Sequence, residues 1–206
     1  MRRWWVLAML AGGGCDDGGE AGGADVAVSA DATSAQDAGA PDAGAGDAGG
    51  PVADQGASIE DVELAAADFD CMLEWTKVRR FYITNKRGRL EEALDVANNP
   101  AGGTYPPGTV IQLVPQEAMV KRAPGWNPVT NDWEFFFLNI DGDGQVTIGA
   151  RGAEDTVNAF GGNCFECHNK AAPQWDLICE QDHGCDPLPL SARVIENLQQ
   201  ADARCR

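Results

Sequence analysis

The chain has 206 residues and is acidic: 32 Asp and Glu residues against 15 Lys and Arg residues give a formal net charge of −17. Residues 16–57 supply −9 of that charge and Arg2 with Arg3 supply +2, so residues 58–206 keep about −10. This balance argues against nucleic acid and anionic lipid as binding partners, because like charges repel.

Residues 1–15 have the pattern of an export signal peptide with a lipobox-like end. Arg2 and Arg3 precede the apolar residues 4–11, a run far shorter than the roughly 20 residues that cross a bilayer. Three glycines then precede Cys15, which resembles the lipid-acceptor cysteine of bacterial lipoproteins. We expect export to the periplasm or the outer cell surface, with lipidated Cys15 as the only membrane anchor. Plain secretion is the alternative.

Residues 16–57 consist almost entirely of Ala, Gly, Asp, Ser and Pro, with no aromatic and no basic residue. Such a segment has too little apolar surface to offset the entropy lost on ordering, and its Asp charges repel one another. We therefore expect a disordered acidic tether between the signal and the folded domain.

Residues 58–206 carry the signals of one α+β domain. Apolar residues at helical spacing predict three helices, at Ser58 to Trp75, Arg89 to Ala97 and Leu190 to Ala203. Short apolar and aromatic runs between turn residues predict strands at residues 80–84, 108–114, 118–122, 133–139 and 145–148. Sequential strands joined by tight turns predict an antiparallel sheet of about four to five strands flanked by helices.

A Cys-x-x-Cys-His motif, Cys164-Phe165-Glu166-Cys167-His168, lies on the C-terminal side of the predicted strands. This is the attachment signature of c-type haem. Each thiol adds to a vinyl group of haem, and the adjacent imidazole is then close enough to be the proximal ligand of the iron. The motif predicts one covalently bound haem c, with His168 on the metal.

Two other interpretations of the motif stay open. Cys164 and Cys167, together with His168 or His183 and with Cys179 or Cys185, could supply four zinc ligands. The motif could also occur by chance. Export favours haem, because thiols in an oxidising compartment are oxidised or joined to a cofactor.

Seven cysteines divide into Cys15 for lipid, two for haem and four others. Three pairings of Cys71, Cys179, Cys185 and Cys205 into two disulfides are allowed. We favour Cys179 with Cys185, which flank a short loop, and hence Cys71 with Cys205.

Strong sixth ligands for the iron are scarce in this sequence. His183 is the only other histidine, and Met72 and Met119 are the only methionines outside the signal region. His183 fits a surface loop and Met119 fits the core, which leaves an open position on the iron. An open position suits the binding or conversion of a small molecule. An electron carrier ligated by His183 or Met119 is the alternative.

Several segments, in this order, resemble the cytochrome P-460 family, which includes the cytochromes c′-beta. They are Phe81-Tyr-Ile-Thr-Asn-Lys-Arg-Gly88, Leu94-Asp-Val-Ala-Asn98, Tyr105-Pro-Pro-Gly-Thr-Val-Ile111, Met119-Val-Lys-Arg-Ala-Pro-Gly-Trp126, Asp132-Trp-Glu-Phe-Phe136 and the haem motif. The resemblance covers roughly Cys71 to Trp175. It implies an antiparallel sheet flanked by helices, a homodimer, and a five-coordinate c-type haem with His168 as its proximal ligand.

The resemblance also suggests what to look for around the haem. Members that oxidise hydroxylamine have a lysine bonded to the haem edge and an acid in the distal pocket, whereas nitric-oxide binders have an apolar pocket without that lysine. At the expected lysine position this chain has Gln112, and Lys121 on the next strand is the alternative, although a solvent-facing charge fits it better. Alternation along residues 133–139 places Glu134 and Phe136 on one strand face. Glu134 is our candidate for the proton acceptor, with Lys121 as a further catalytic candidate, and Phe136 and Gln112 are our candidates for the distal pocket.

Together these patterns predict an exported mono-haem oxidoreductase of the cytochrome P-460 type. Its iron acts on hydroxylamine or nitric oxide and its electrons pass to a partner protein. The alternatives are a non-catalytic nitric-oxide-binding protein of the cytochrome c′-beta type and an electron carrier.

Overall fold

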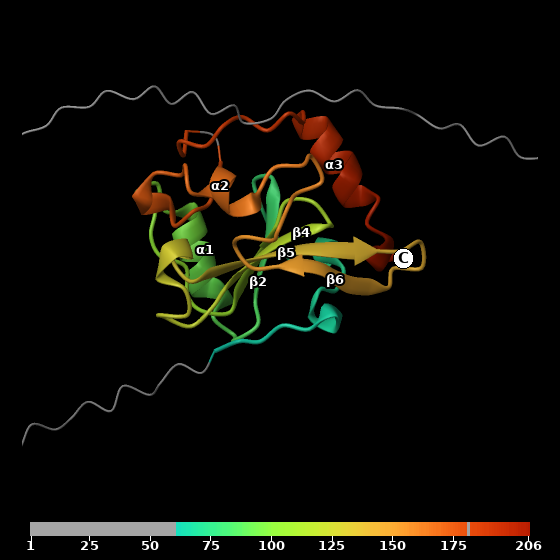
Figure 1. Cartoon of the computed structure of the whole chain (residues 1–206), viewed down its shortest axis with the longest axis horizontal. Helices are drawn as coiled ribbons and strands as arrows, with labels where there is room; N and C mark the ends of the chain where they lie inside the picture. Colours follow the sequence, from blue (N-terminus) through green and yellow to red (C-terminus); the bar gives the residue numbers. More distant parts are fainter. Residues whose placement is uncertain (1–60, 181) are drawn as a thin grey trace, which may run out of the picture. The chain divides into compact units, whose positions relative to one another are not determined.

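The computed structural model describes residues 61–180 and 182–206, in which six strands form one antiparallel sheet (Figure 1). The strands follow one another in space in chain order, so the sheet is the predicted meander. They are β1 (Thr76–Val78), β2 (Phe81–Asn85), β3 (Thr109–Gln112), β4 (Glu117–Lys121), β5 (Trp133–Ile140) and β6 (Val146–Arg151). The α+β class is confirmed, with one strand more than the sequence indicated. The signal peptide, Cys15 and the acidic tether lie outside the described residues.

The turn between β5 and β6 shows how local chemistry sets the meander. The Asp141 carboxylate accepts hydrogen bonds from the backbone N–H groups of Asp143 and Gln145, both at 2.9 Å. Gly144 has a φ of +80°, and a Cβ there would lie 2.7 Å from the Ala203 carbonyl oxygen. Only glycine fits here, because it adopts the left-handed backbone readily and has no Cβ to clash with the C-terminal segment.

The predicted helix between Ser58 and Trp75 is wrong over its described part. The chain instead makes two short 3-10 helices, η1 (Ala66–Asp68) and η2 (Met72–Glu74), and then enters β1. The cause is tertiary, because Arg122, directly after β4, binds the Asp61 carboxylate through Nε at 3.0 Å and holds the chain extended there. Contacts of this kind override a modest helix propensity.

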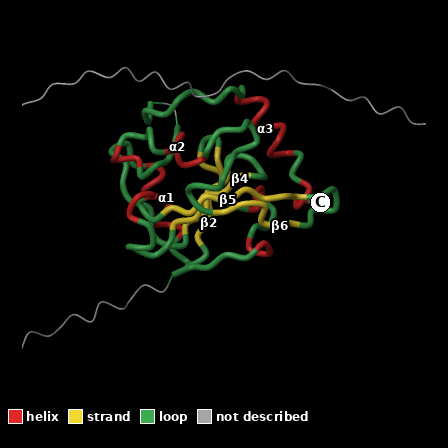
Figure 2. The backbone as a smooth tube through the Cα atoms, viewed as in Figure 1, coloured by secondary structure: helices red, strands yellow, loops and turns green. Residues whose placement is uncertain are grey.

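Three α-helices accompany the sheet, and two of them match the sequence. They are α1 (Leu90–Asn98), α2 (Cys164–His168) and α3 (Ala192–Gln200). Ser191 caps α3 through the Val194 N–H, as a serine at this position favours. The short helix α2 contains the haem motif, and Figure 2 shows that loops form most of the chain around it, between β6 and α3.

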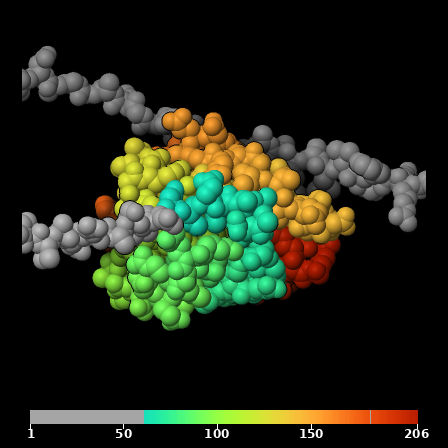
Figure 3. Space-filling model, turned by 90° about the horizontal axis from the view of Figure 1, so that it is seen from below, coloured from blue at the N-terminus to red at the C-terminus, as the bar shows by residue number. Residues whose placement is uncertain are grey.

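The sheet has two covered faces, and this division decides which side chains can meet. On one face, α1 and α2 pack on Ile83, Met119 and Phe135. On the other face, Leu64 and Phe69 of the N-terminal segment pack on the sheet. The described part of this segment lies on the face of the molecule seen in Figure 3. We call the two faces of the sheet the α2 face and the N-terminal face. Residues at alternate positions of one strand belong to different faces.

Both favoured disulfides are present in the described part of the chain. Cys71 and Cys205 are joined at 2.08 Å across 134 residues, and Cys179 and Cys185 at 1.95 Å across six. The first ties η2 to η5 (Ala203–Cys205), and the second closes the short loop. Among the described residues, no helix has the length and apolar character needed to cross a membrane.

Candidate haem-attachment site

Asn163 fixes the start of α2 and the loop that leads to it. Its side-chain oxygen accepts the Glu166 N–H at 3.0 Å, and its side-chain nitrogen donates to the carbonyls of Ala153 and Glu154. Residues three apart on a helix lie on the same side of it. Cys164 and Cys167 are therefore presented together, one turn apart, as attachment to one porphyrin requires.

His168 is oriented by a single hydrogen bond. Its Nδ1 lies 2.7 Å from the carbonyl oxygen of Leu177. A carbonyl only accepts, so Nδ1 carries the proton and Nε2 keeps the lone pair that binds a metal. Burial lowers the pKa of His168, opposed by the bond to Leu177, and so favours the neutral ring that a metal needs. The Phe135 ring on β5 packs against it, with the ring centroids 5.4 Å apart.

The residues of α2 fit a c-type haem better than zinc. Neither of the two disulfides includes Cys164 or Cys167, whereas the two candidates for the further zinc-binding cysteine, Cys179 and Cys185, are bonded to each other. Burial raises the pKa of the Cys164 thiol to about 12, which disfavours the thiolate that zinc binds. Within residues 61–180 and 182–206, no group of three or more His, Cys, Asp or Glu side chains could hold a metal ion.

Three of the predicted distal residues lie on the wrong face of the sheet. Glu134 pairs across the strands with Val120, and Phe136 pairs with Ala118, and both of these partners belong to the N-terminal face. Gln112 follows Val110 of the same face at strand spacing. The helix α2, which contains the Cys-x-x-Cys-His motif, packs on the opposite face. The prediction that these side chains form the haem pocket is therefore corrected, since the sheet separates them from His168.

Glu134 has a structural role instead. Its side chain, 4% exposed, lies between two guanidinium groups, bonding to Arg122 and accepting from Arg151 Nε at 2.6 Å. Arg122 also binds Asp61 and Glu63 of the N-terminal segment. The cluster fastens that segment to the sheet and leaves Glu134 no path to a haem ligand.

Gln112 and Phe136 are equally engaged. The Gln112 amide donates to the Pro115 carbonyl at 3.0 Å and its oxygen accepts from Arg204 at 3.3 Å. Phe136 packs against Phe69, with ring centroids 5.1 Å apart. Both side chains therefore anchor the two ends of the domain to the sheet.

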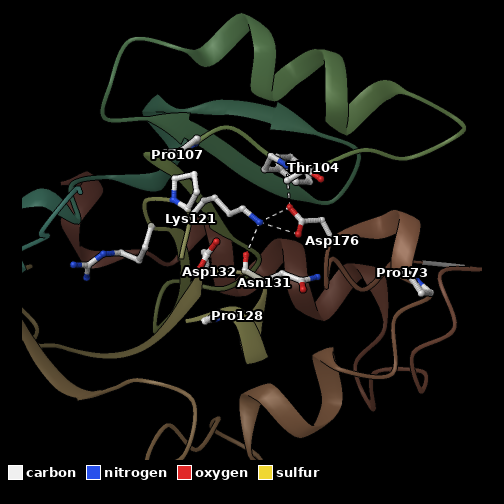
Figure 4. Close-up of a pocket in the computed structure, with 11 residues that line it drawn as sticks. Thr104, Pro107, Lys121, Pro128, Asn131, Asp132, Pro173 and Asp176 are labelled. Atoms are coloured by element: carbon white, nitrogen blue, oxygen red, sulfur yellow. Dashed lines mark hydrogen bonds and ion pairs between the residues drawn. The ribbon is translucent and has the colours of Figure 1, made fainter. Parts of the chain in front are cut away.

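Lys121 is the one distal candidate on the α2 face, since it pairs with Trp133. The expectation of a solvent-facing charge is wrong, because the residue is 4% exposed. Its Nζ donates to both carboxylate oxygens of Asp176 at 2.8 Å and to the Asn131 carbonyl at 2.6 Å (Figure 4). Burial lowers the pKa of Lys121 and raises the pKa of Asp176. The negative charge of Asp176 opposes the first shift, and the positive charge of Lys121 opposes the second.

A cavity of about 400 Å³ adjoins this ion pair. Its lining combines charged side chains with proline rings, and includes Thr104, Lys121, Asn131, Pro173 and Asp176. The ammonium is held at the cavity wall by three acceptors on two partners. A nitrogen tied in this way is a poor nucleophile toward a haem edge.

Glu117 is an acid near the motif that the sequence analysis missed. It lies two residues before Met119 on β4 and so points to the α2 face. Its Oε1 accepts the Ala159 N–H at 3.1 Å, and its charge contributes to the raised pKa of the Cys164 thiol. Burial raises the pKa of Glu117 itself. Strand alternation from Lys121 backwards would have found it.

Glu117 gives a pH prediction. A carboxyl group whose pKa is raised by folding adds stability at pH values below its ordinary pKa of 4.5. That stability is lost as the pH rises through the folded-state pKa. Glu117→Gln is therefore expected to flatten the decline in the free energy of unfolding across this window, as measured by denaturant titration from about pH 4 to about pH 8. Exposed Glu91→Gln on α1 is the control and should keep the slope. Equal slopes for both variants would contradict the raised pKa of Glu117.

The two alternative iron ligands have other contacts. The His183 ring stacks on Trp175 at 3.9 Å and 3°, and its Nδ1 lies 2.6 Å from the Ile178 carbonyl oxygen. Met119 is 6% exposed within the core of the α2 face. Met119 lies in the core, as the sequence indicated, whereas His183, which was expected on a surface loop, is half-buried and has a packing role.

Comparisons of the chain with protein-family models, with curated proteins and with solved structures find no match. The resemblance to the cytochrome P-460 family, and the homodimer that it implies, therefore stay predictions from the residues. What can be argued about function comes from the geometry around α2.

Proposed function

We propose that this chain is an exported mono-haem c-type cytochrome that binds a small nitrogen compound, nitric oxide or hydroxylamine, at an open axial position and exchanges electrons with a partner protein. One observation carries the proposal: Cys164 and Cys167 share a helix with His168, whose Nδ1 donates to Leu177 and whose Nε2 is left as the ligand atom. When bound, haem supplies an iron that takes a small ligand and changes its oxidation state.

The chain's own residues have distinct tasks in this proposal. Cys164 and Cys167 hold the porphyrin through thioethers, and the Leu177 carbonyl keeps the His168 ring in one tautomer. Phe135 and Met119 cover the sheet side of α2 and exclude water. Glu117, with its raised pKa, is an acid on this face that can hold or release a proton near the site.

The contacts of two side chains favour nitric-oxide binding, as in cytochromes c′-beta, over hydroxylamine oxidation. Lys121 is bound to Asp176 and Asn131, and Glu134 is bound to two arginines on the far side of the sheet. Lys121 is therefore not placed for the haem–lysine bond, and Glu134 is not placed to exchange a proton at the site. We therefore expect haem without a lysine cross-link.

The test is to produce the protein together with a c-type haem assembly system and to measure intact mass and absorbance. We expect the mass of the polypeptide plus one haem, a high-spin spectrum, and pigment that acid and organic solvent do not extract. The double variant Cys164→Ser with Cys167→Ser is the matched control and should lose all bound pigment on extraction. A colourless wild-type protein would overturn the proposal.

Ligand assays then separate the two nitrogen chemistries. Nitric oxide is expected to shift the absorbance of the reduced protein, while hydroxylamine with an electron acceptor is expected to give no sustained turnover. Steady turnover, together with a red-shifted haem and an extra cross-link in the mass spectrum, would instead select the oxidising type.

A further inference from the structure

The backbone that holds His168 is strained at two successive residues. Asp176 has a φ of 49° and Leu177 a φ of 63°, the left-handed region that side chains other than glycine rarely adopt. Two such residues in a row persist only where the surrounding structure over-determines them. Leu177 is the residue whose carbonyl accepts from His168 Nδ1.

The Asp176 side chain supplies that constraint. Its carboxylate accepts from Lys121 Nζ at 2.8 Å through both oxygens, and from the Tyr105 N–H at 2.9 Å. Both charged side chains of the pair are 5% exposed. Lys121 belongs to β4, and it is itself held by the Asn131 carbonyl just before β5 (Figure 4). The turn at 176–177 is thus attached to the centre of the sheet.

We infer that the buried Lys121–Asp176 pair is a positioning device for the proximal ligand. The pair holds the left-handed turn, the turn directs the Leu177 carbonyl at His168 Nδ1, and that hydrogen bond sets the tautomer and direction of the imidazole. The inference rests on the proposed function, because it assigns Lys121 to the proximal side of the same site.

The chemistry that follows concerns the strength of the iron ligand. A histidine that donates its second N–H to a good acceptor gains basicity and becomes a stronger ligand. Stronger donation stabilises the oxidised iron and lowers the reduction potential. Removing the device is therefore expected to raise the potential and to weaken the iron–histidine bond.

The experiment removes the whole pair rather than one charge. The double variant Lys121→Met with Asp176→Leu leaves no unpaired buried charge, and such replacements are often tolerated by the fold. We expect a positive shift in reduction potential and a lower iron–histidine stretching frequency in the resonance Raman spectrum of the reduced protein. Asp176→Asn keeps a side-chain oxygen for the Tyr105 N–H and for Lys121 but removes the counter-charge, so its potential and stretching frequency should lie between those of wild type and of the double variant.

Two further measurements keep the test decisive. In haem-free protein, nitrogen-15 NMR of His168 should show the Nδ1–H tautomer in wild type and its loss in the double variant. Glu134→Gln is the control for stability alone and should leave the potential, the stretching frequency and the tautomer unchanged. If the double variant keeps the wild-type tautomer and potential, the positioning role is overturned while the haem proposal stands. A wild-type protein without pigment overturns the haem proposal, and the tautomer measurement still decides the contact.

Discussion

Replacing Glu134 by glutamine is expected to lower the free energy of unfolding by about 3–5 kcal/mol, the usual cost of removing one partner from a buried ion pair. The side chain is 4% exposed between Arg122 and Arg151, so the variant leaves two guanidinium groups without their central anion. Urea denaturation followed by circular dichroism measures the loss. If the proposed haem is bound, the absorbance and the nitric-oxide response of the folded variant are expected to match wild type, because Glu134 and His168 lie on opposite faces of the sheet.

Glu63 provides the matched control for this substitution. Its carboxylate contacts the same two arginines at 2.8 Å, but its side chain is 68% exposed. Glu63→Gln is expected to cost less than about 1 kcal/mol, since water and salt screen exposed pairs. Equal losses for the two variants would show that burial is not what makes Glu134 important. A folded Glu134→Gln protein with an altered haem spectrum would restore its catalytic interpretation.

Removing the disulfide between Cys71 and Cys205 is expected to have an effect of similar size. The bond closes a loop of 134 residues, and the chain-entropy model gives about 5 kcal/mol for a loop of that length. The Cys179–Cys185 bond closes only six residues and is expected to contribute about 2 kcal/mol by the same model. Double serine variants at each pair, compared by thermal and urea unfolding, measure the two contributions.

The order of the two losses is the informative result. The long loop includes nearly the whole domain, since its ends are Cys71, directly before η2, and Cys205 in η5. Beside that bond, Arg204 donates to the Phe69 carbonyl at 3.2 Å and to Gln112 at 3.3 Å, which fastens the C-terminus to the sheet. A larger loss from the short loop would mean that native contacts around Lys170 to Asp186, rather than chain entropy, dominate disulfide stability here.

Much of the fold was accessible from local pattern. Turn residues and short apolar runs predicted the meander, and helical spacing predicted α1 and α3. The cysteine positions predicted both disulfides. The motif itself placed two thiols and an imidazole together, since all three lie within five residues of one short helix. Local signals suffice in these cases because the interactions are between residues near in sequence, or are covalent.

The surroundings of the motif were beyond the sequence alone. Alternation correctly grouped Glu134 with Phe136, yet it could not say which strand face would meet α2, because that depends on where a helix thirty residues further along comes to rest. From sequence, Lys121 is expected to be an exposed charge, because its buried partner, Asp176, lies 55 residues away along the chain. The helix predicted before Trp75 failed because Arg122 holds Asp61 across 61 residues. Sequence determines what each segment can form locally, whereas packing between distant segments decides which faces are covered and which charges are paired.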